Sequence, residues 1–150
     1  MSNARDKLID QYFETAINKR FGNLIDNPSE AVQLAAVQDF GGAIKYIKNP
    51  SEAVQLAAVE QNGSAIRHIK NPSEAVQLSA VSRYATALQD ITNPSEAVQL
   101  AAVCHCVDVI KFIKNPSEEV QLAAVERRPS SIRFIKNPTD EVAVYARLLV

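Results

Sequence analysis

One motif, Asn-Pro-Ser-Glu-Ala-Val-Gln-Leu-Ala-Ala-Val, recurs along the chain with a fixed period of 22 residues and no insertion or deletion between copies. The copies begin at the following asparagines, the last of them in altered form: Asn27, Asn49, Asn71, Asn93, Asn115 and Asn137. A fixed period in this range indicates a repeat array, in which each unit packs on its neighbours, rather than a globule with one central core. The repeat therefore predicts binding along a surface as the mode of action, without identifying the partner.

Each copy predicts one full α-helix followed by a short one. In the first copy we expect Asn27 to be the N-cap, Pro28 the first helical residue and Glu30 the partner in a capping box, with the helix ending near Gln38. Apolar residues cover more than half of this helix, as expected when a helix is sandwiched between copies of itself. A break at residues 39–42 separates it from a helix of about two turns, expected to be partly 3₁₀.

The side chains of this short helix are expected to divide into two groups. Ala43, Ile44 and Ile47 are predicted to face inward, and Lys45, Tyr46 and Lys48 outward. In the long helix, the glutamines that recur once per copy are expected at its exposed centre, with hydrogen bonds between them along the stack as the alternative. These are Gln33, Gln55, Gln77, Gln99 and Gln121.

We expect a single repeat domain over residues 1–150. Its predicted parts are an N-terminal cap at 1–26, repeats at 27–48, 49–70, 71–92, 93–114 and 115–136, and a shortened C-terminal cap repeat at 137–150. An amphipathic stripe predicts the cap helix at about residues 3–20. In the last copy Arg147 replaces a valine that is expected to be buried elsewhere. The final residues Leu148–Val150 either tuck under the preceding short helix, mark a truncation, or stack on a second molecule.

The Asn-Pro opening, the Val-x-Leu-Ala-Ala-Val helix and the Ile-x-x-Ile half-helix together resemble the leucine-rich repeat variant and related short helical repeats, which are similar in shape to HEAT and armadillo arrays. The resemblance covers residues 27–150 and implies an all-α, right-handed α-solenoid of alternating longer and shorter helices. Such families share no catalytic residues, so the resemblance implies no chemistry. The verbatim copying of the motif is unusual among natural arrays and is typical of recent duplication or of a consensus-like design.

Composition excludes several functional classes. The net charge of −1 gives no global field that would attract nucleic acid or a membrane surface. Without an apolar signal-peptide core or an apolar run near the roughly 18 residues of a membrane span, the expected location is cytoplasmic. Cys104 and Cys106 are too close for a structural disulfide, and with His68 they do not have the spacing of an ordinary zinc site. With no nucleophile or phosphate-loop motif, we expect neither an enzyme nor a cofactor.

Differences among the copies concentrate between the two helices and on the outer face of the short helix. Drift on a solvated surface, or aromatic packing between short helices, would be the simplest explanations. However, drift would seldom leave Tyr46, Phe112 and Phe134 at one equivalent position, and aromatic residues are enriched where partners dock. We therefore expect a protein-binding scaffold. The expected contacts are Phe40, Tyr46, His68, Tyr84, Phe112 and Phe134, with Lys45, Arg67, Lys111, Arg128 and Arg133 as rim charges.

Two alternatives remain. The basic row of the short helices could follow a phosphate backbone in nucleic acid. That row is broken at Gln89, Asp90 and Thr92, and bases in a last turn, like acids in a first turn, also complement helix dipoles. The second alternative is a structural or self-assembling array, with a homodimer formed through Leu148–Val150.

Overall fold

The computed structural model describes residues 29–149, and the predicted N-terminal cap, with Asn27 and Pro28, lies outside them. Long α-helices alternate with six-residue 3₁₀ helices, which are labelled η. In order they are α2 (Glu30–Asp39), η1 (Gly41–Tyr46), α3 (Glu52–Gln61), η2 (Gly63–His68), α4 (Glu74–Arg83), η3 (Ala85–Asp90), α5 (Glu96–His105), η4 (Val107–Phe112), α6 (Glu118–Arg127), η5 (Pro129–Phe134) and α7 (Asp140–Leu148). No strand occurs in residues 29–149, which confirms the predicted all-α repeat array.

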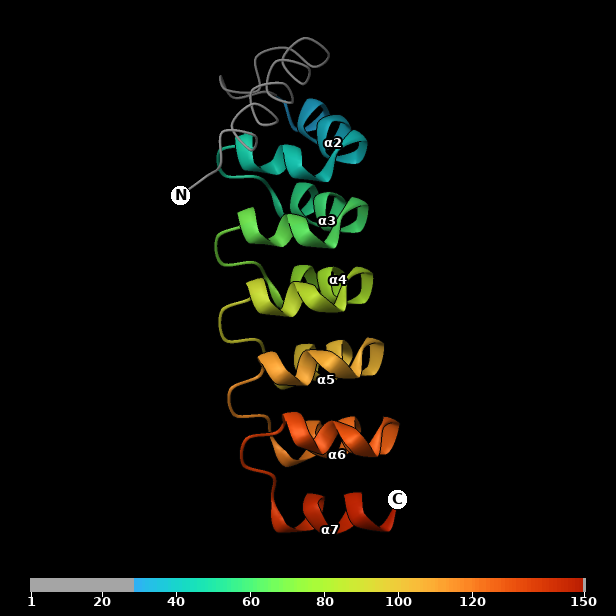
Figure 1. Cartoon of the computed structure of the whole chain (residues 1–150). Helices are drawn as coiled ribbons and strands as arrows, with labels where there is room; N and C mark the ends of the chain where they lie inside the picture. Colours follow the sequence, from blue (N-terminus) through green and yellow to red (C-terminus); the bar gives the residue numbers. More distant parts are fainter. Residues whose placement is uncertain (1–28, 150) are drawn as a thin grey trace, which may run out of the picture.

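The α-helices stack in a single column, from α2 at the top to α7 at the bottom of Figure 1. Each α-helix contacts the next one, and each η helix packs against its own α-helix and against the following repeat. The longer connections, which contain the Asn-Pro pairs, all lie along one edge of the column (Figure 1). Over the described part of the chain, no helix is long and apolar enough to cross a membrane.

The long helices begin two residues later than the sequence suggested. Ser51 is the N-cap of α3, and its Oγ accepts a hydrogen bond from the backbone N–H of Val54 at 3.4 Å. Equivalent serines cap α4, α5 and α6, and Thr139 caps α7. The predicted capping box within one repeat is therefore wrong in these copies. The first-turn glutamate instead accepts from the serine of the next repeat, as Glu52 does from Ser73.

The Asn-Pro pair forms the turn before the helix rather than its first residues. Asn49, Asn71 and Asn93 have positive φ angles of 51°, 50° and 52°, a left-handed conformation that asparagine tolerates better than most residues. The proline after each of them is held by the glutamine once thought to be exposed. In α3, for example, Gln55 Nε2 donates to the carbonyl oxygen of Pro50 at 2.9 Å. These glutamines are half-buried or, in the case of Gln121, buried, so their predicted exposure is wrong.

The short helices are 3₁₀ throughout, so the sequence identified their type but not their extent. A 3₁₀ helix aligns every third residue, which places Gly41 and Ile44 on one face. Both are buried, as are Ala43 and the extended residue Ile47 that follows the helix. The expected break at residues 39–42 shrinks to Phe40 alone, in an extended conformation with φ −148° and ψ 103°. One extended residue is enough to reverse the chain, so most residues assigned to this loop belong to helices.

Small and medium side chains fill the core. In α3, Val54, Ala58 and Val59 are fully buried, and the equivalent valines and alanines are fully buried in α4, α5 and α6. In α7 the equivalent of Val59 is Arg147, which is exposed as its charge requires. Leu148 is 76% exposed and Leu149 is 44% exposed. They therefore do not tuck under the preceding short helix, which was one of the three expectations for them.

Candidate functional site

The predicted contact residues fall on two separate parts of each repeat. We call the last two residues of each η helix the short-helix row: Lys45, Tyr46, Arg67, His68, Gln89, Asp90, Lys111, Phe112, Arg133 and Phe134. We call the single residue between each α-helix and the next η helix a corner: Phe40, Asn62, Tyr84, Cys106 and Arg128. The first four residues of each 3₁₀ helix lie between a corner and the row, which separates the two by about 10 Å at about 2 Å per residue. Phe40, Tyr84 and Arg128 therefore do not join the other predicted contacts.

In three repeats of the short-helix row, a basic side chain lies over the aromatic ring of the residue that follows it. The Nζ atom of Lys45 lies 4.7 Å from the centroid of the Tyr46 ring, and that of Lys111 lies 4.9 Å from the Phe112 ring. The guanidinium carbon of Arg133 is 4.7 Å from the ring of Phe134. At exposed positions such contacts stabilise by about 0.5–1 kcal/mol each, which is enough to orient a long side chain.

Exposure along this row is uneven. Tyr46 and Phe134 are half-buried and pack against the core. Such burial is expected if these aromatic residues serve mainly to pack the array. Phe112 is 41% exposed, and Lys111 and Arg133 are exposed beside it and below it. The region around η4 and η5 therefore presents the most accessible combination of ring and positive charge in the row.

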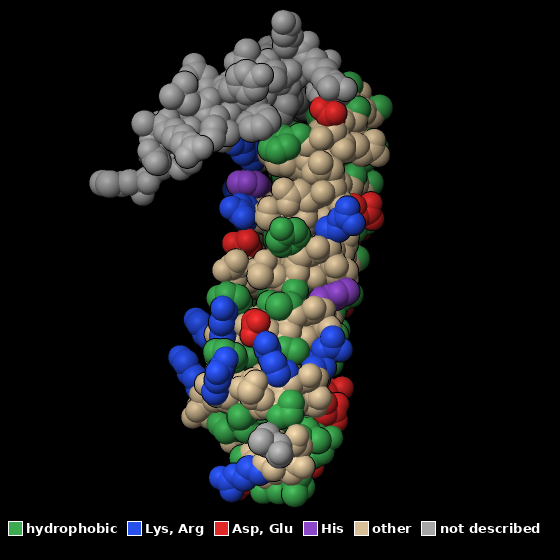
Figure 2. Space-filling view, turned by 45° about the vertical axis from the view of Figure 1, so that its right-hand side comes forward, with side chains coloured by type: hydrophobic (Ala, Val, Ile, Leu, Met, Phe, Trp, Pro, Cys, Tyr) green, Lys and Arg blue, Asp and Glu red, His purple; other side chains and the backbone are tan. Residues whose placement is uncertain are grey.

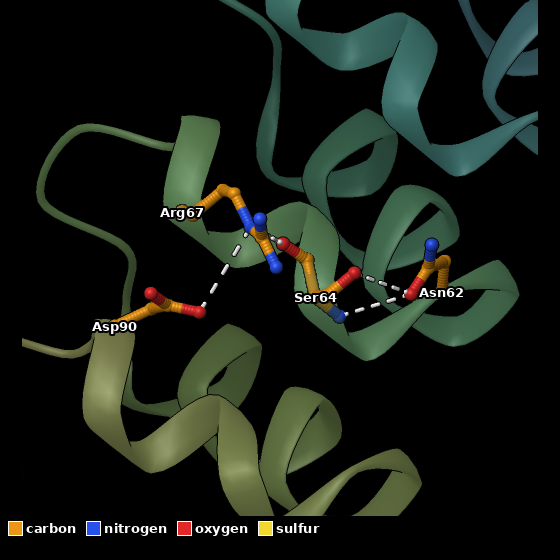
Figure 3. Close-up of polar contacts among 4 residues, drawn as sticks. All are labelled: Asn62, Ser64, Arg67 and Asp90. Carbon is orange, nitrogen blue, oxygen red and sulfur yellow. Dashed lines mark hydrogen bonds and ion pairs between the residues drawn. The ribbon is translucent and has the colours of Figure 1, made fainter. Parts of the chain in front are cut away.

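The row is interrupted at η3. Arg67 Nε lies 4.0 Å from Asp90 Oδ2 in the next repeat and donates to the carbonyl oxygen of Ser64 at 3.1 Å (Figure 3). Asn62 Oδ1 accepts from the backbone N–H and the hydroxyl of Ser64, at 3.1 Å and 2.8 Å, and so fixes the start of η2. Arg67 is thus partly neutralised and held in place. His68, next to it, is exposed.

The corners differ along the array. Phe40 is half-buried against the core, with its ring beside Gly42, whereas Tyr84 is 60% exposed. Arg128 is half-buried, and its Nη2 forms an ion pair with Asp108 of the preceding repeat. The corner residues Tyr84 and Arg128 therefore present more polar and aromatic surface to solvent than Phe40 does at the first corner.

The predicted acidic row has a structural role in the first repeats. Glu30, Glu52 and Glu74 accept hydrogen bonds from the N-cap hydroxyls of Ser51, Ser73 and Ser95, respectively. Each bond links the start of one α-helix to the start of the next. These carboxylates therefore stabilise the stack and do not pair with the basic row.

Lys and Arg side chains gather over the lower part of the array, around the height of α5 and α6 (Figure 2). Hydrophobic side chains lie between them, and histidine side chains appear at opposite edges of this face (Figure 2). The last two complete repeats contain these Lys and Arg residues: Lys111, Lys114, Arg127, Arg128, Arg133 and Lys136. A net charge near zero thus conceals a locally basic surface.

The Cys-His-Cys segment contains two free thiols, those of Cys104 and Cys106. Among residues 29–149, no group of three or more His, Cys, Asp or Glu side chains could hold a metal ion.

One set of basic residues was missed. Arg83, His105 and Arg127 are the last residues of α4, α5 and α6, directly before the corners. The equivalent residues in the first two repeats are Asp39 and Gln61. Aligning the repeats would have revealed this change to basic side chains, which was hidden because the residues had been assigned to loops.

The fold and these surfaces define the class of protein: a helical-repeat array with a 22-residue unit of one α-helix and one 3₁₀ helix. Comparisons of the chain with protein-family models, with curated proteins and with solved structures gave no match.

Proposed function

We propose that this chain is a non-enzymatic scaffold that binds another protein through the short-helix row. The observation that carries the proposal is the stacking of a base on an aromatic ring at the same place in three repeats. A held base keeps its charge toward solvent at little further entropic cost, and the ring beneath it supplies apolar contact area. Phe112, flanked by Lys111 and Arg133, is the expected centre of the interface.

The spacing of the repeats favours an extended, acidic segment of the partner. Neighbouring helices lie about 8–10 Å apart, and an extended chain in the polyproline II conformation advances about 3.1 Å per residue with three residues per turn. Every third residue of such a segment would therefore meet the next repeat. We expect acidic side chains three residues apart in the partner, one for Lys111 and one for Arg133.

A displayed library of short random peptides, selected on the full chain, tests the proposal. Enriched peptides should carry acidic residues three apart, and their affinity should fall about tenfold or more for the Lys111→Ser/Phe112→Ser/Arg133→Ser variant. The matched control is Arg83→Ser/Tyr84→Ser/Arg127→Ser, which removes the same kinds of side chain near the corners. Binding that is insensitive to the first variant would contradict the proposal.

The same proposal places the array among short helical repeats similar to the leucine-rich repeat variant and to HEAT-like arrays. The regular alternation of a ten-residue α-helix with a six-residue 3₁₀ helix supports this class. The two free cysteines are in keeping with a reducing compartment such as the cytoplasm.

Nucleic-acid binding is a weaker candidate. The basic cluster around α5 and α6 favours it, but the Arg67–Asp90 ion pair interrupts the row that a phosphate backbone would follow. A mixed nucleic-acid pool titrated across a salt series discriminates the two, because phosphate contacts give a steep loss of affinity with salt. No binding at low salt would remove this candidate.

Self-association through α7 is a further candidate, favoured by the exposed side chains of Val144, Leu148 and Leu149. Sedimentation of the full chain and of a Leu148→Ser/Leu149→Ser variant tests it. A dimer that dissociates in the variant would support self-association, and a monomer in both would exclude it.

A further inference from the structure

A second surface, at the corners of the last three complete repeats, has features that the first two repeats lack. The cause is the residue that follows the corner. A Cβ placed on Gly41 would lie 2.5 Å from the carbonyl oxygen of Ala58, and one on Gly63 would lie 2.7 Å from that of Ala80. The next α-helix therefore closes directly over these glycines.

In the first repeat a hydrogen-bonded clasp adds to this closure. Gln61 Oε1 accepts from the backbone N–H of Gly41 at 2.9 Å, and Gln61 Nε2 donates to the carbonyl oxygen of Asp39 at 3.4 Å. The side chain of one repeat thus covers the corner of the repeat before it.

Later repeats carry larger residues at the same place, Ala85 and Val107. A Cβ at this position does not fit at the separation that the following helix has over Gly41 and Gly63. The residues equivalent to Gln61 are now His105 and Arg127, which do not form the clasp. The corners are open as a result.

Two adjoining open cavities lie at these corners. One, of about 350 Å³, is lined by residues that include Arg83, Tyr84 and His105. The other, of about 460 Å³, is lined by residues that include His105, Arg127 and Arg128. Both are also lined by Cys106, so they lie next to each other, and we call the two cavities together the corner groove.

The corner groove is basic and has an unused donor. Three arginines, Arg83, Arg127 and Arg128, line it against one carboxylate, that of Asp108. The Nε atom of Arg128 is buried and has no hydrogen-bond partner among the described residues, although Nη2 of the same side chain pairs with Asp108. This Nε is closed off from solvent and from a ligand, but the Arg128 side chain as a whole is 42% exposed.

We propose that the corner groove is a second binding site, for a peptide segment with a carboxylate next to an apolar side chain. The carboxylate would accept from Arg127 and Arg128, whose planar donors suit it. The apolar side chain would lie in the neighbouring cavity beside the exposed ring of Tyr84. This site is separate from the short-helix row and does not depend on the function proposed for that row.

The test is selection of a displayed library of short random peptides on the full chain, followed by affinity measurement on variants. Enriched peptides are expected to pair an acidic residue with an apolar neighbour. Their affinity should fall about tenfold or more for Arg127→Ser/Arg128→Ser, because charge-assisted hydrogen bonds are lost. The matched control, Lys48→Ser/Lys70→Ser, removes two exposed bases that lie outside both the corner groove and the short-helix row, and should bind as the parent does.

A second variant tests the opening of the corners without changing any charge. Ala85→Gly/Val107→Gly restores the residue that lets the following helix close, and should also weaken binding. Circular dichroism melting of each variant verifies that it is folded. The proposal is overturned if no acidic peptide is enriched, if the arginine or glycine variants bind as the parent does, or if these arginines bind a single-stranded oligonucleotide and no peptide.

Discussion

The side-chain oxygen of Gln121 accepts a hydrogen bond from the backbone N–H of Thr139, 3.2 Å away, and so joins the middle of α6 to the start of α7. Its Nε2 donates to the carbonyl oxygen of Pro116 at 3.0 Å. Gln99 has only the second kind of bond, from Nε2 to the carbonyl oxygen of Pro94 at 2.9 Å, and its buried Oε1 has no partner among the described residues. Glutamines at equivalent positions of the repeat thus form different numbers of hydrogen bonds.

We predict that Gln121→Ala lowers the free energy of unfolding by about 2 kcal/mol and Gln99→Ala by about 1 kcal/mol, because two and one hydrogen bonds are lost. Urea denaturation measures both. Gln89→Ala, at an exposed position of η3, is the control and should change stability by less than about 0.5 kcal/mol. Equal losses for Gln121→Ala and Gln99→Ala would show that the bond to Thr139 contributes nothing.

The left-handed asparagines predict that a substitution to glycine has opposite effects on stability in different repeats. Asn71 has a φ of 50°, so Asn71→Ala should cost about 1 kcal/mol, whereas Asn71→Gly should be neutral or stabilising. Asn115 does not have a positive φ, so Asn115→Gly should destabilise by about 0.5–1 kcal/mol. Thermal melts of the three variants check this order, and a stabilising Asn115→Gly would contradict it.

Because α3 closes over the first corner, we predict that Gly41→Ala and the reverse change at the equivalent position, Ala85→Gly, differ in their cost to stability. Gly41→Ala should cost about 1–3 kcal/mol, because its Cβ would meet the backbone oxygen of Ala58. The reverse change at the equivalent site, Ala85→Gly, removes no close contact of this kind and should cost about 1 kcal/mol or less. Chemical denaturation distinguishes them, and equal costs would argue against steric closure at Gly41.

Ser131 offers a stabilising substitution. It is fully buried, and its Oγ has no hydrogen-bond partner among the described residues. Three of the other repeats have alanine at this place: Ala43, Ala65 and Ala87. Ser131→Ala should therefore stabilise the chain by about 1 kcal/mol, since an unsatisfied buried hydroxyl is removed.

Differential scanning calorimetry should show a higher Tm for Ser131→Ala and an unchanged one for the control Ser130→Ala, at an exposed position. A lower Tm for Ser131→Ala would indicate that the hydroxyl does have a partner.

The periodicity of the sequence was sufficient to predict the architecture. Buried positions such as Val54, Ala58 and Val59 repeat in each unit from α3 to α6, and the next Asn-Pro pair limits the length of the short helix. Helix starts were harder, because both Asn-Pro-x-Glu and Ser-Glu-x-x satisfy the sequence rules for an N-terminus. The choice between them depends on the bond from Gln55 to Pro50 and on the bond from Ser73 to Glu52, which lies between repeats.

The candidate sites could be predicted only in part. Pairing of Lys111 with Phe112 follows from their adjacency, but the exposure of each ring depends on how the neighbouring short helix packs. The corner groove could not be foreseen from charge alone. The contrast with the first corner, where the backbone of the following repeat lies directly over Gly41, depends on how closely two repeats approach each other. The residue types alone do not reveal that separation.

The glycine contacts at Gly41 and Gly63 have a wider consequence. At both glycines the next unit approaches so closely that a Cβ would lie within 2.7 Å of its backbone, so a methyl group or larger at that position requires a wider separation. Unit spacing can therefore change at one place while the helices and their caps stay the same. A chain of near-identical copies can in this way acquire a surface that occurs only once along its length, through substitutions that leave the copied motif untouched.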